Sequence, residues 1–163
     1  MARGNTLEPL LHGHPLKPTD ADLAALSAGL GHAFARVEFA AEALTHRSAL
    51  DRRPELKAAF PQGNERLEFL GDRVLSLAMA DLLLQRFPHE REGGLARRHA
   101  ALVRAETLVE IATEIGLGPY LRLGDSERAH GDSIQPNILA DALEALLGAV
   151  YLDGGFERAA ACV

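Results

Sequence analysis

One nearly continuous apolar helix limits the folds that this chain can adopt. Residues 138–150, ILADALEALLGAV, place apolar side chains on almost every side of a helix, and Asp141 and Glu144 are the only charges among them. A helix that is apolar all round is buried in a folded protein. We therefore expect other elements to surround it. Its carboxylates then need a cation, a polar partner or water, because a buried unpaired charge costs several kcal/mol.

A second helix carries acidic residues at helical spacing. We expect Asn64 to cap this helix and Pro88 to end it. Apolar residues recur between them with the period of a helix, at positions 67, 70, 74, 77, 78 and 82. Glu68 and Asp72 are four residues apart, so they share one face, and Glu65 lies on the same stripe. The stripe continues into apolar residues, so this face is mixed.

The two acidic pairs predict a metal site if their helices pack side by side. Four carboxylates would then meet without a histidine or cysteine, and this is a ligand set that suits Mg²⁺ better than zinc. The chemistry implied is metal-assisted attack of water on a phosphodiester. The alternative is that each pair belongs to a solvated helix face, as in most amphipathic helices. Two pairs on two apolar helices weaken that alternative, but spacing alone leaves both interpretations open.

The remaining sequence also favours helices, separated by glycine and proline. The first 18 residues lack periodicity and are expected to form a flexible arm, which leaves 19–163 as the predicted domain. Gly93 and Gly94 are expected to separate the Asn64 helix from a helical stretch that breaks at Arg104 or Ala105. Further helices are expected from Thr19, over 39–49, from Pro136 and after Gly154-Gly155. We expect a loop or short helical turn over 51–63 and an irregular segment over 117–136.

The predicted fold class is all-α, with roughly six to eight helices, because strand-like alternation is weak throughout. The net charge of -6 is weak evidence against binding nucleic acid by charge alone, yet a carboxylate metal site would shift the charge in the same direction. Cys162 is the single cysteine, so no intramolecular disulfide can form. The chain shows no signal peptide and no membrane span, and we expect a cytoplasmic protein.

Five segments resemble the ribonuclease III family, in the order in which that family has them. NERLEFLGDRVL at 64–75 resembles the family signature. The other segments are LTHRS at 44–48, REGGLARRHAALV at 91–103, YLRLG at 120–124 and ILADALEALLGAVYLD at 138–153. Together they cover nearly all of the expected domain, so the resemblance is specific.

The resemblance implies an all-α endonuclease domain that forms a homodimer and binds double-stranded RNA in a valley between subunits. Such enzymes use Mg²⁺, for which Mn²⁺ can substitute, and leave 5′-phosphate and 3′-hydroxyl ends with a short 3′ overhang. By motif position, Glu68, Asp72, Asp141 and Glu144 match the family's metal-binding carboxylates. Asp72 and Glu144 are expected to be catalytic, with Glu144 closest to the metal. Processing of ribosomal and messenger RNA is the implied role.

The same comparison suggests residues that contact RNA or the second subunit. Glu65 matches an acidic position near the dimer interface and RNA, although a first-turn glutamate favoured by the helix dipole is an equal alternative. Phe69 resembles the aromatic residue that inserts into the partner, with a core phenylalanine as the alternative. The expected phosphate contacts, unless they form a solvated face, are Arg97, Arg98 and Arg104. His46 and Arg47 are interpreted as structural.

The chain also departs from the family pattern. HGDSIQPN at 130–137 lacks a basic residue that the family often has, and YLRLG continues with DSE where glycine is common. The basic RNA-binding domain that usually follows is absent, so we expect this to be part of a longer protein. A catalytically silent RNA- or ribosome-binding module is the alternative function, but it predicts loss of a metal carboxylate. A di-iron protein would need Glu-x-x-His pairs, which do not occur.

Overall fold

The computed structural model describes residues 20–128 and 134–163, so the predicted arm over residues 1–18 lies outside the described residues. Within the described ranges the chain forms nine α-helices and two short 3₁₀-helices, and the all-α prediction is confirmed. The one β-type pairing among these residues is an isolated parallel bridge between Thr45 and Arg122. No described helix is long and apolar enough to cross a membrane.

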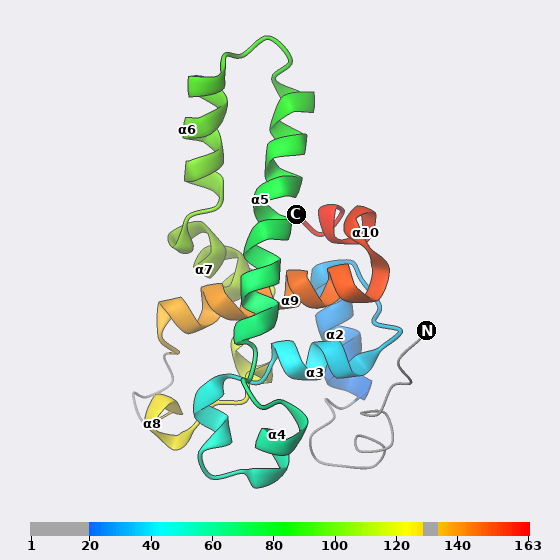
Figure 1. The fold of residues 1–163 in the computed structure, drawn as a ribbon, viewed down its shortest axis with the longest axis vertical. Coiled ribbons are helices and arrows are strands. Elements are labelled where there is room, and N and C mark those ends of the chain that lie inside the picture. Colours follow the sequence, from blue (N-terminus) through cyan, green and yellow to red (C-terminus); the bar gives the residue numbers. More distant parts are fainter. Residues whose placement is uncertain (1–19, 129–133) are drawn as a thin grey trace.

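Figure 1 shows the order of the helices along the chain. They are α2 (Asp20–Leu30), α3 (Val37–Ala43), η1 (Arg47–Leu50), α4 (Pro54–Ala59), α5 (Glu65–Arg86), α6 (Glu92–Leu102), α7 (Ala105–Glu114), η2 (Gly118–Tyr120), α8 (Asp125–Arg128), α9 (Pro136–Gly154) and α10 (Phe156–Ala160). The long helix α5 crosses α9 in the middle of the molecule and then continues upward, where it pairs with α6 as a hairpin that projects from the body.

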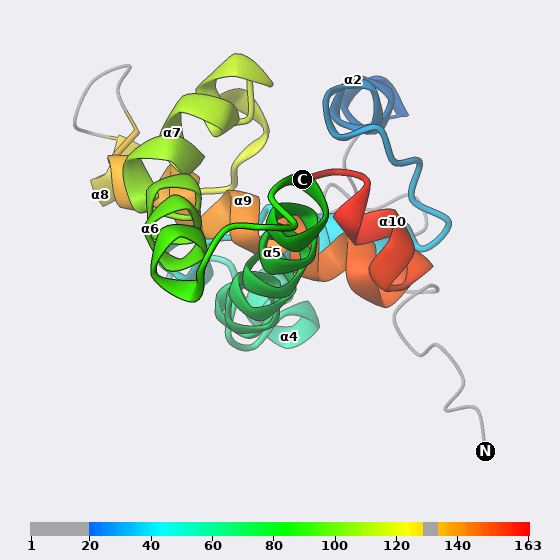
Figure 2. The same cartoon turned by 90° about the horizontal axis from the view of Figure 1, so that it is seen from above.

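Helix α9 is the centre of the fold, as its apolar sequence predicts. It packs against α3, α5, α7 and α10, and Figure 2 shows α7 and α10 toward its opposite ends. Ten of its residues are buried, including every residue from Ala145 to Val150. The helix ends at Gly154, and the next residue, Gly155, has a φ of 82°, a backbone conformation that favours glycine.

The crossing of α5 and α9 depends on two glycines. A Cβ atom on Gly71 of α5 would overlap the backbone carbonyl of Glu144, and a Cβ on Gly148 of α9 would overlap the backbone carbonyl of Leu67. Any side chain at either position would therefore push the two helices apart. These glycines fix how closely the acidic residues on the two helices can approach.

The C-terminal end of α9 is tied to the segment that joins α2 to α3. The Asp153 carboxylate is almost fully buried and accepts hydrogen bonds from the backbone N–H groups of Ala35 and Arg36, both at 2.9 Å. It also lies 2.9 Å from Nε2 of His32. These backbone and side-chain partners lower the pKa of Asp153 although its burial acts in the opposite direction.

One predicted helix boundary was wrong, because the backbone groups beyond it bond to a residue far along the chain. The helix expected over 39–49 ends at Ala43. The Leu44 carbonyl then accepts a hydrogen bond from Arg122 N instead of continuing the helix. The segment 51–63, expected to be a loop or a short helical turn, contains the six-residue helix α4. The predicted break at Arg104 or Ala105 is confirmed, because Arg104 is the N-cap residue of α7.

Two further expectations were wrong in detail. Gly93 and Gly94 do not separate helices but lie within α6, which starts at Glu92, and the side chain of Glu90 occupies the space beside Gly94. Asn64 precedes α5 as expected, but its side chain makes no capping hydrogen bond and is buried. The structure also has more α-helices within residues 20–128 and 134–163 than the six to eight expected, because α4, α8 and α10 are short.

Candidate metal centre

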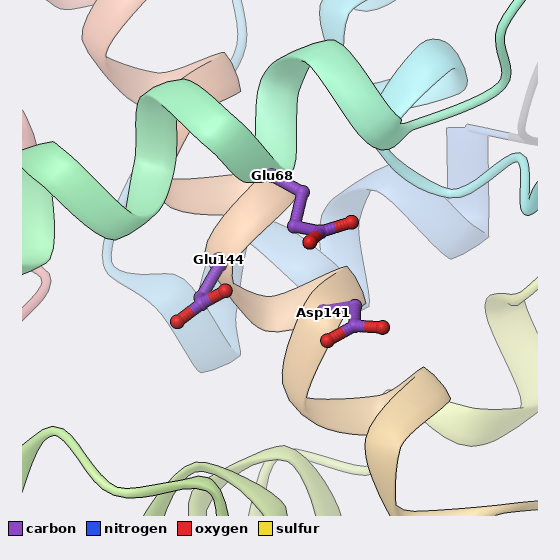
Figure 3. A group of neighbouring side chains, drawn as sticks. All are labelled: Glu68, Asp141 and Glu144. Carbon is purple, nitrogen blue, oxygen red and sulfur yellow. The ribbon is translucent and has the colours of Figure 1, made fainter.

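Three of the four predicted carboxylates converge where α5 crosses α9. Glu68 lies in the first turn of α5, and Asp141 and Glu144 lie one turn apart on α9. One oxygen from each carboxylate lies within 4.8 Å of the others. Figure 3 shows Glu68 extending from α5 toward the two side chains of α9. The close approach at Gly71 and Gly148 is what makes this possible, because Glu68 is less than one turn from Gly71.

Burial raises the pKa of all three carboxylates, and neighbouring carboxylates raise the pKa of Glu68 and of Glu144 further. Burial raises the pKa of Glu144 to about 7, and the charges of Asp141 and Glu68 add to this effect, while Arg73 opposes it. Burial also raises the pKa of Glu68, with further contributions from Asp141 and Glu65. The pKa of Asp141 is raised by burial and lowered in part by His46. Three half-buried carboxylates thus face one another at a distance where their charges repel.

The residues fit a divalent cation that prefers oxygen ligands. Three carboxylates whose oxygens lie within 4.8 Å supply oxygen ligands only. A divalent cation among them would favour their charged forms and so oppose the burial and the neighbouring charges that raise their pKa values. The solvated-face interpretation explains this arrangement less well, since all three side chains are half-buried rather than exposed.

Asp72 lies outside this group. It is one turn further along α5, its side chain is 38% exposed, and it forms an ion pair with the neighbouring Arg73. The geometry therefore brings together Glu68, Asp141 and Glu144 and leaves Asp72 at the edge of the site. Its roles as a metal ligand and a catalytic residue stay predictions.

Glu65 and Phe69 are both exposed at the start of α5. Glu65 accepts a hydrogen bond of 3.0 Å from Nη1 of Arg47, which agrees with the expectation that Arg47 anchors a loop. Phe69 is 67% exposed, so it is not a core residue of this chain. It borders an open pocket of about 730 Å³, whose other lining residues are Glu42, Gln62, Glu65, Arg66, Leu67, Leu70 and Leu152.

The arginines predicted to contact phosphate are all exposed, but two of them have partners within the chain. Arg98 donates a hydrogen bond of 2.7 Å to Glu90, and its guanidinium lies 4.0 Å above the ring of Phe87. Arg98 therefore supports the turn between α5 and α6. Arg104 lies 3.4 Å from the Thr107 hydroxyl. Arg97 is exposed on α6, and RNA contacts of all three stay predictions.

Sequence reasoning did not identify the two glycines that form the crossing. A glycine inside a helix costs roughly 1 kcal/mol relative to alanine, and this cost is a signal of close packing. Gly71 directly precedes Asp72, and Gly148 is four residues after Glu144. The sequence does not indicate which backbone each glycine approaches. That Gly71 and Gly148 bring α5 and α9 together is visible only in the packed structure.

The sequence matches the family model described as "Ribonuclease-III-like" over residues 37–163. It is similar to the proteins named Ribonuclease 3 of Dinoroseobacter shibae, with 48% identity over 142 residues, and of Pseudomonas fluorescens, with 49% over 137 residues. These alignments cover 87% and 84% of this chain but 59% and 56% of the relatives. The chain thus spans a little more than half the length of the curated relatives it matches.

The fold is also similar to a solved structure. The nuclease domain of ribonuclease III from Campylobacter jejuni superposes with a TM-score of 0.76 and 36% sequence identity, over 86% of this chain and 92% of that one. That structure is described as showing flexibility in a region involved in dimer formation. The similarity thus extends over nearly the whole of that nuclease domain.

Proposed function

The chain belongs to the ribonuclease III family, and from this premise we propose that it is a Mg²⁺-dependent endonuclease that cleaves double-stranded RNA. The observation that carries the proposal is the group of Glu68, Asp141 and Glu144 at the crossing of α5 and α9. The products would carry 5′-phosphate and 3′-hydroxyl ends with a short 3′ overhang. Processing of ribosomal and messenger RNA in the cytoplasm is part of the same proposal.

We assign each acidic side chain of the site a role from its position. Glu68, Asp141 and Glu144 would hold Mg²⁺ through one oxygen each, and Asp72 would act from the next turn of α5. Bound Mg²⁺ would lower the pKa of water and neutralise charge on the phosphodiester, and Mn²⁺ would substitute for it. Glu144 is the proposed ligand closest to the cation, which must displace its proton near neutral pH, because burial, Asp141 and Glu68 raise its pKa to about 7.

The proposal includes a homodimer formed through the exposed face of α5. Phe69, Leu77 and Leu84 lie on one side of this helix and are 67%, 58% and 59% exposed. Exposed apolar residues that line up in this way mark interaction surfaces. The pocket beside Phe69 offers a second copy of this chain a place for its own Phe69. Two copies would supply two acidic sites, one for each RNA strand.

Binding of duplex RNA by this chain should be weak and sensitive to salt. The net charge of -6 gives little general attraction to phosphate, and Arg98 and Arg104 already have partners within the chain. Arg97, Arg98 and Arg104 are the proposed contacts to the RNA backbone, supported by their exposure on α6 and at the start of α7. Cleavage assays therefore belong at low ionic strength.

The decisive experiment is cleavage of a long RNA duplex in Mg²⁺ by the wild type and by Glu144→Gln. We expect the variant to lose activity by on the order of 10³-fold or more, because it removes a charged ligand without changing side-chain size. Glu110→Gln, an exposed change on α7, is the matched control and should cleave as the wild type does.

Two results would contradict this function. Undiminished cleavage by Glu144→Gln would show that the three-carboxylate group is not the active site. A wild type that binds duplex RNA but does not cut it in Mg²⁺ or Mn²⁺ would favour the silent binding module instead.

A further inference from the structure

The segment Leu44–Ser48 carries His46, which interacts electrostatically with Asp141, and is held in place by residues 122–124. The Leu44 carbonyl accepts a hydrogen bond from Arg122 N at 2.8 Å, and His46 N donates to the Arg122 carbonyl at 3.0 Å. A Cβ atom on Gly124 would lie 2.5 Å from the Ser48 carbonyl oxygen, so the two backbones are in close contact. This part of the chain therefore has little freedom to move.

The hydrogen bonds of His46 determine which ring nitrogen carries its proton. Nδ1 lies 3.3 Å from the backbone N–H of Ser48, which can only donate, so Nδ1 must be an acceptor. Nδ1 also lies 2.8 Å from the Ser48 hydroxyl, and that hydroxyl accepts a hydrogen bond from Gly124 N at 2.9 Å. The neutral ring therefore carries its proton on Nε2. Burial lowers the pKa of His46, which favours this neutral form.

The ring of His46 lies within reach of charges from four elements. Glu127 of α8, Asp141 of α9 and Glu65 of α5 raise its pKa, while Arg47 of η1 lowers it, and burial outweighs them all. The interaction with Asp141 is mutual, since His46 also lowers the pKa of Asp141. Within residues 20–128 and 134–163, no hydrogen bond joins the ring to these acids. Among the described residues, Nε2–H of this half-buried imidazole thus has no protein acceptor, and the ring interacts electrostatically with Asp141 and Glu65 of the acidic site.

The basic side chains around the site already have partners. Arg47 donates to Glu65, Arg73 pairs with Asp72, and Arg122 donates to the Ala41 carbonyl at 3.0 Å and the Thr45 hydroxyl at 3.1 Å. A phosphodiester that approaches three carboxylates needs hydrogen-bond donors from the protein as well as a cation. Nε2–H of His46 is such a donor, fixed in direction by Ser48.

We propose that His46 binds the substrate, by donating a hydrogen bond from Nε2 to a phosphate oxygen of RNA that lies over the three carboxylates. This inference rests on the function proposed above. A neutral donor suits the position, because it can contact phosphate without adding a positive charge that competes with the metal for the carboxylates. Ser48 and Gly124 serve this contact indirectly, since they hold the ring in the required tautomer.

Two substitutions separate this contact from the structural role of His46. His46→Asn keeps an oxygen where Nδ1 accepts from Ser48 N, and Asn is a favourable residue before a helical turn, but it removes the distal donor. His46→Gln places an amide donor near the Nε2 position but loses the bond to Ser48. His89→Asn, an exposed change at the turn between α5 and α6, is the matched control.

We expect His46→Asn to lower kcat/KM for a short RNA duplex about tenfold, the effect of one lost hydrogen bond to a charged group. Its melting temperature and the Mg²⁺ concentration for half-maximal activity should match the wild type. His46→Gln should melt at a lower temperature but keep more of the activity than His46→Asn. Unchanged kcat/KM in His46→Asn overturns the proposal. So does a shift confined to the Mg²⁺ requirement, because His46 would then act through a metal ligand.

A measurement without metal tests the same contact independently of activity. In EDTA, the ¹⁵N resonances of the His46 ring should report a neutral ring with its proton on Nε2, and adding duplex RNA should shift the Nε2 signal but not the His89 signals. A proton on Nδ1, or an Nε2 signal that RNA leaves unchanged, contradicts the proposal. If the wild type neither binds nor cleaves the duplex, the proposed function fails instead.

Discussion

Burial and the charges of Asp141 and Glu68 disfavour the ionised form of Glu144 when no cation is bound. The stability of the metal-free protein therefore depends on pH. The pKa of Glu144 in the folded protein is about 7, raised by burial and by Asp141 and Glu68. In the unfolded chain the pKa returns to its ordinary lower value. Folding is thus favoured by the protonated form, and this stabilisation is lost as the pH rises through about 7.

Glu144→Gln should therefore stabilise the metal-free protein at pH 8, because glutamine stays neutral. We expect a gain on the order of 1 kcal/mol, reduced by solvent screening because the side chain is only half-buried. The difference should disappear near pH 4, below the ordinary pKa of a glutamate, and should reverse in saturating Mg²⁺, which binds the wild type more tightly. Thermal unfolding in EDTA across this pH range measures it, and a less stable variant at pH 8 in EDTA would be inconsistent with the repulsion described.

At the residue scale, helical spacing in the sequence identified the acidic residues of the site but not how deeply each is buried. The sequence predicted Glu68, Asp141 and Glu144, and all three lie together. It also placed Asp72 in the set, because i and i+4 residues share a helix face, but one turn of α5 is enough to place Asp72 at the edge. The pKa of about 7 depends on burial by neighbouring elements, and no sequence pattern reports that burial.

At the element scale, the site depends on how closely α5 and α9 approach. Gly71→Ala should force the helices apart, because its new Cβ would overlap the backbone of Glu144. We expect a loss of roughly 1–3 kcal/mol of stability or more, together with weaker Mg²⁺ binding, since Glu68 moves away from α9. Thermal unfolding and isothermal titration with Mg²⁺ measure the two effects.

Gly93→Ala is the control, because a Cβ there would meet only the end of the Arg97 side chain, at 3.9 Å. This change within α6 should leave Mg²⁺ binding unaltered and add roughly 0.5 kcal/mol of stability through helix propensity. If Gly71→Ala behaved like Gly93→Ala, the close crossing would not be what assembles the site.

The extent of α5 and α9 could be predicted because long periodic segments carry strong signals. Both helices end within a few residues of the expected positions. The short helices were missed or misplaced where tertiary contacts decide the outcome. The helix that contains Ala43 stops there because the next backbone groups bond to Arg122, which lies far along the chain. Such a partner cannot be read from local periodicity.

At the scale of the whole molecule, the three most exposed large apolar side chains among the described residues all lie on the exposed face of α5. Leaving Phe69 67% exposed forgoes roughly 1–2 kcal/mol of stabilisation from burial, and Leu77 and Leu84 on the same side add to this. The sequence left Phe69 undecided between core and subunit contact, because a period of 3.6 residues shows that a residue is apolar but not what covers it. In the fold, Phe69 does not lie in the core of its own chain. We propose that a second copy of the chain covers it.

Phe69→Ala should therefore convert a dimer into a monomer without unfolding the chain. The melting temperature measured on dilute protein should change little, because the side chain has few contacts within its own chain. Sedimentation velocity at tens of micromolar should show a dimer for the wild type and a monomer for the variant, and cleavage of both RNA strands together should decline with dimer content. Leu82→Ala removes another exposed apolar residue, from a different side of α5, and should stay dimeric. A dimeric Phe69→Ala, or a monomeric wild type, would assign the exposed face of α5 to another contact.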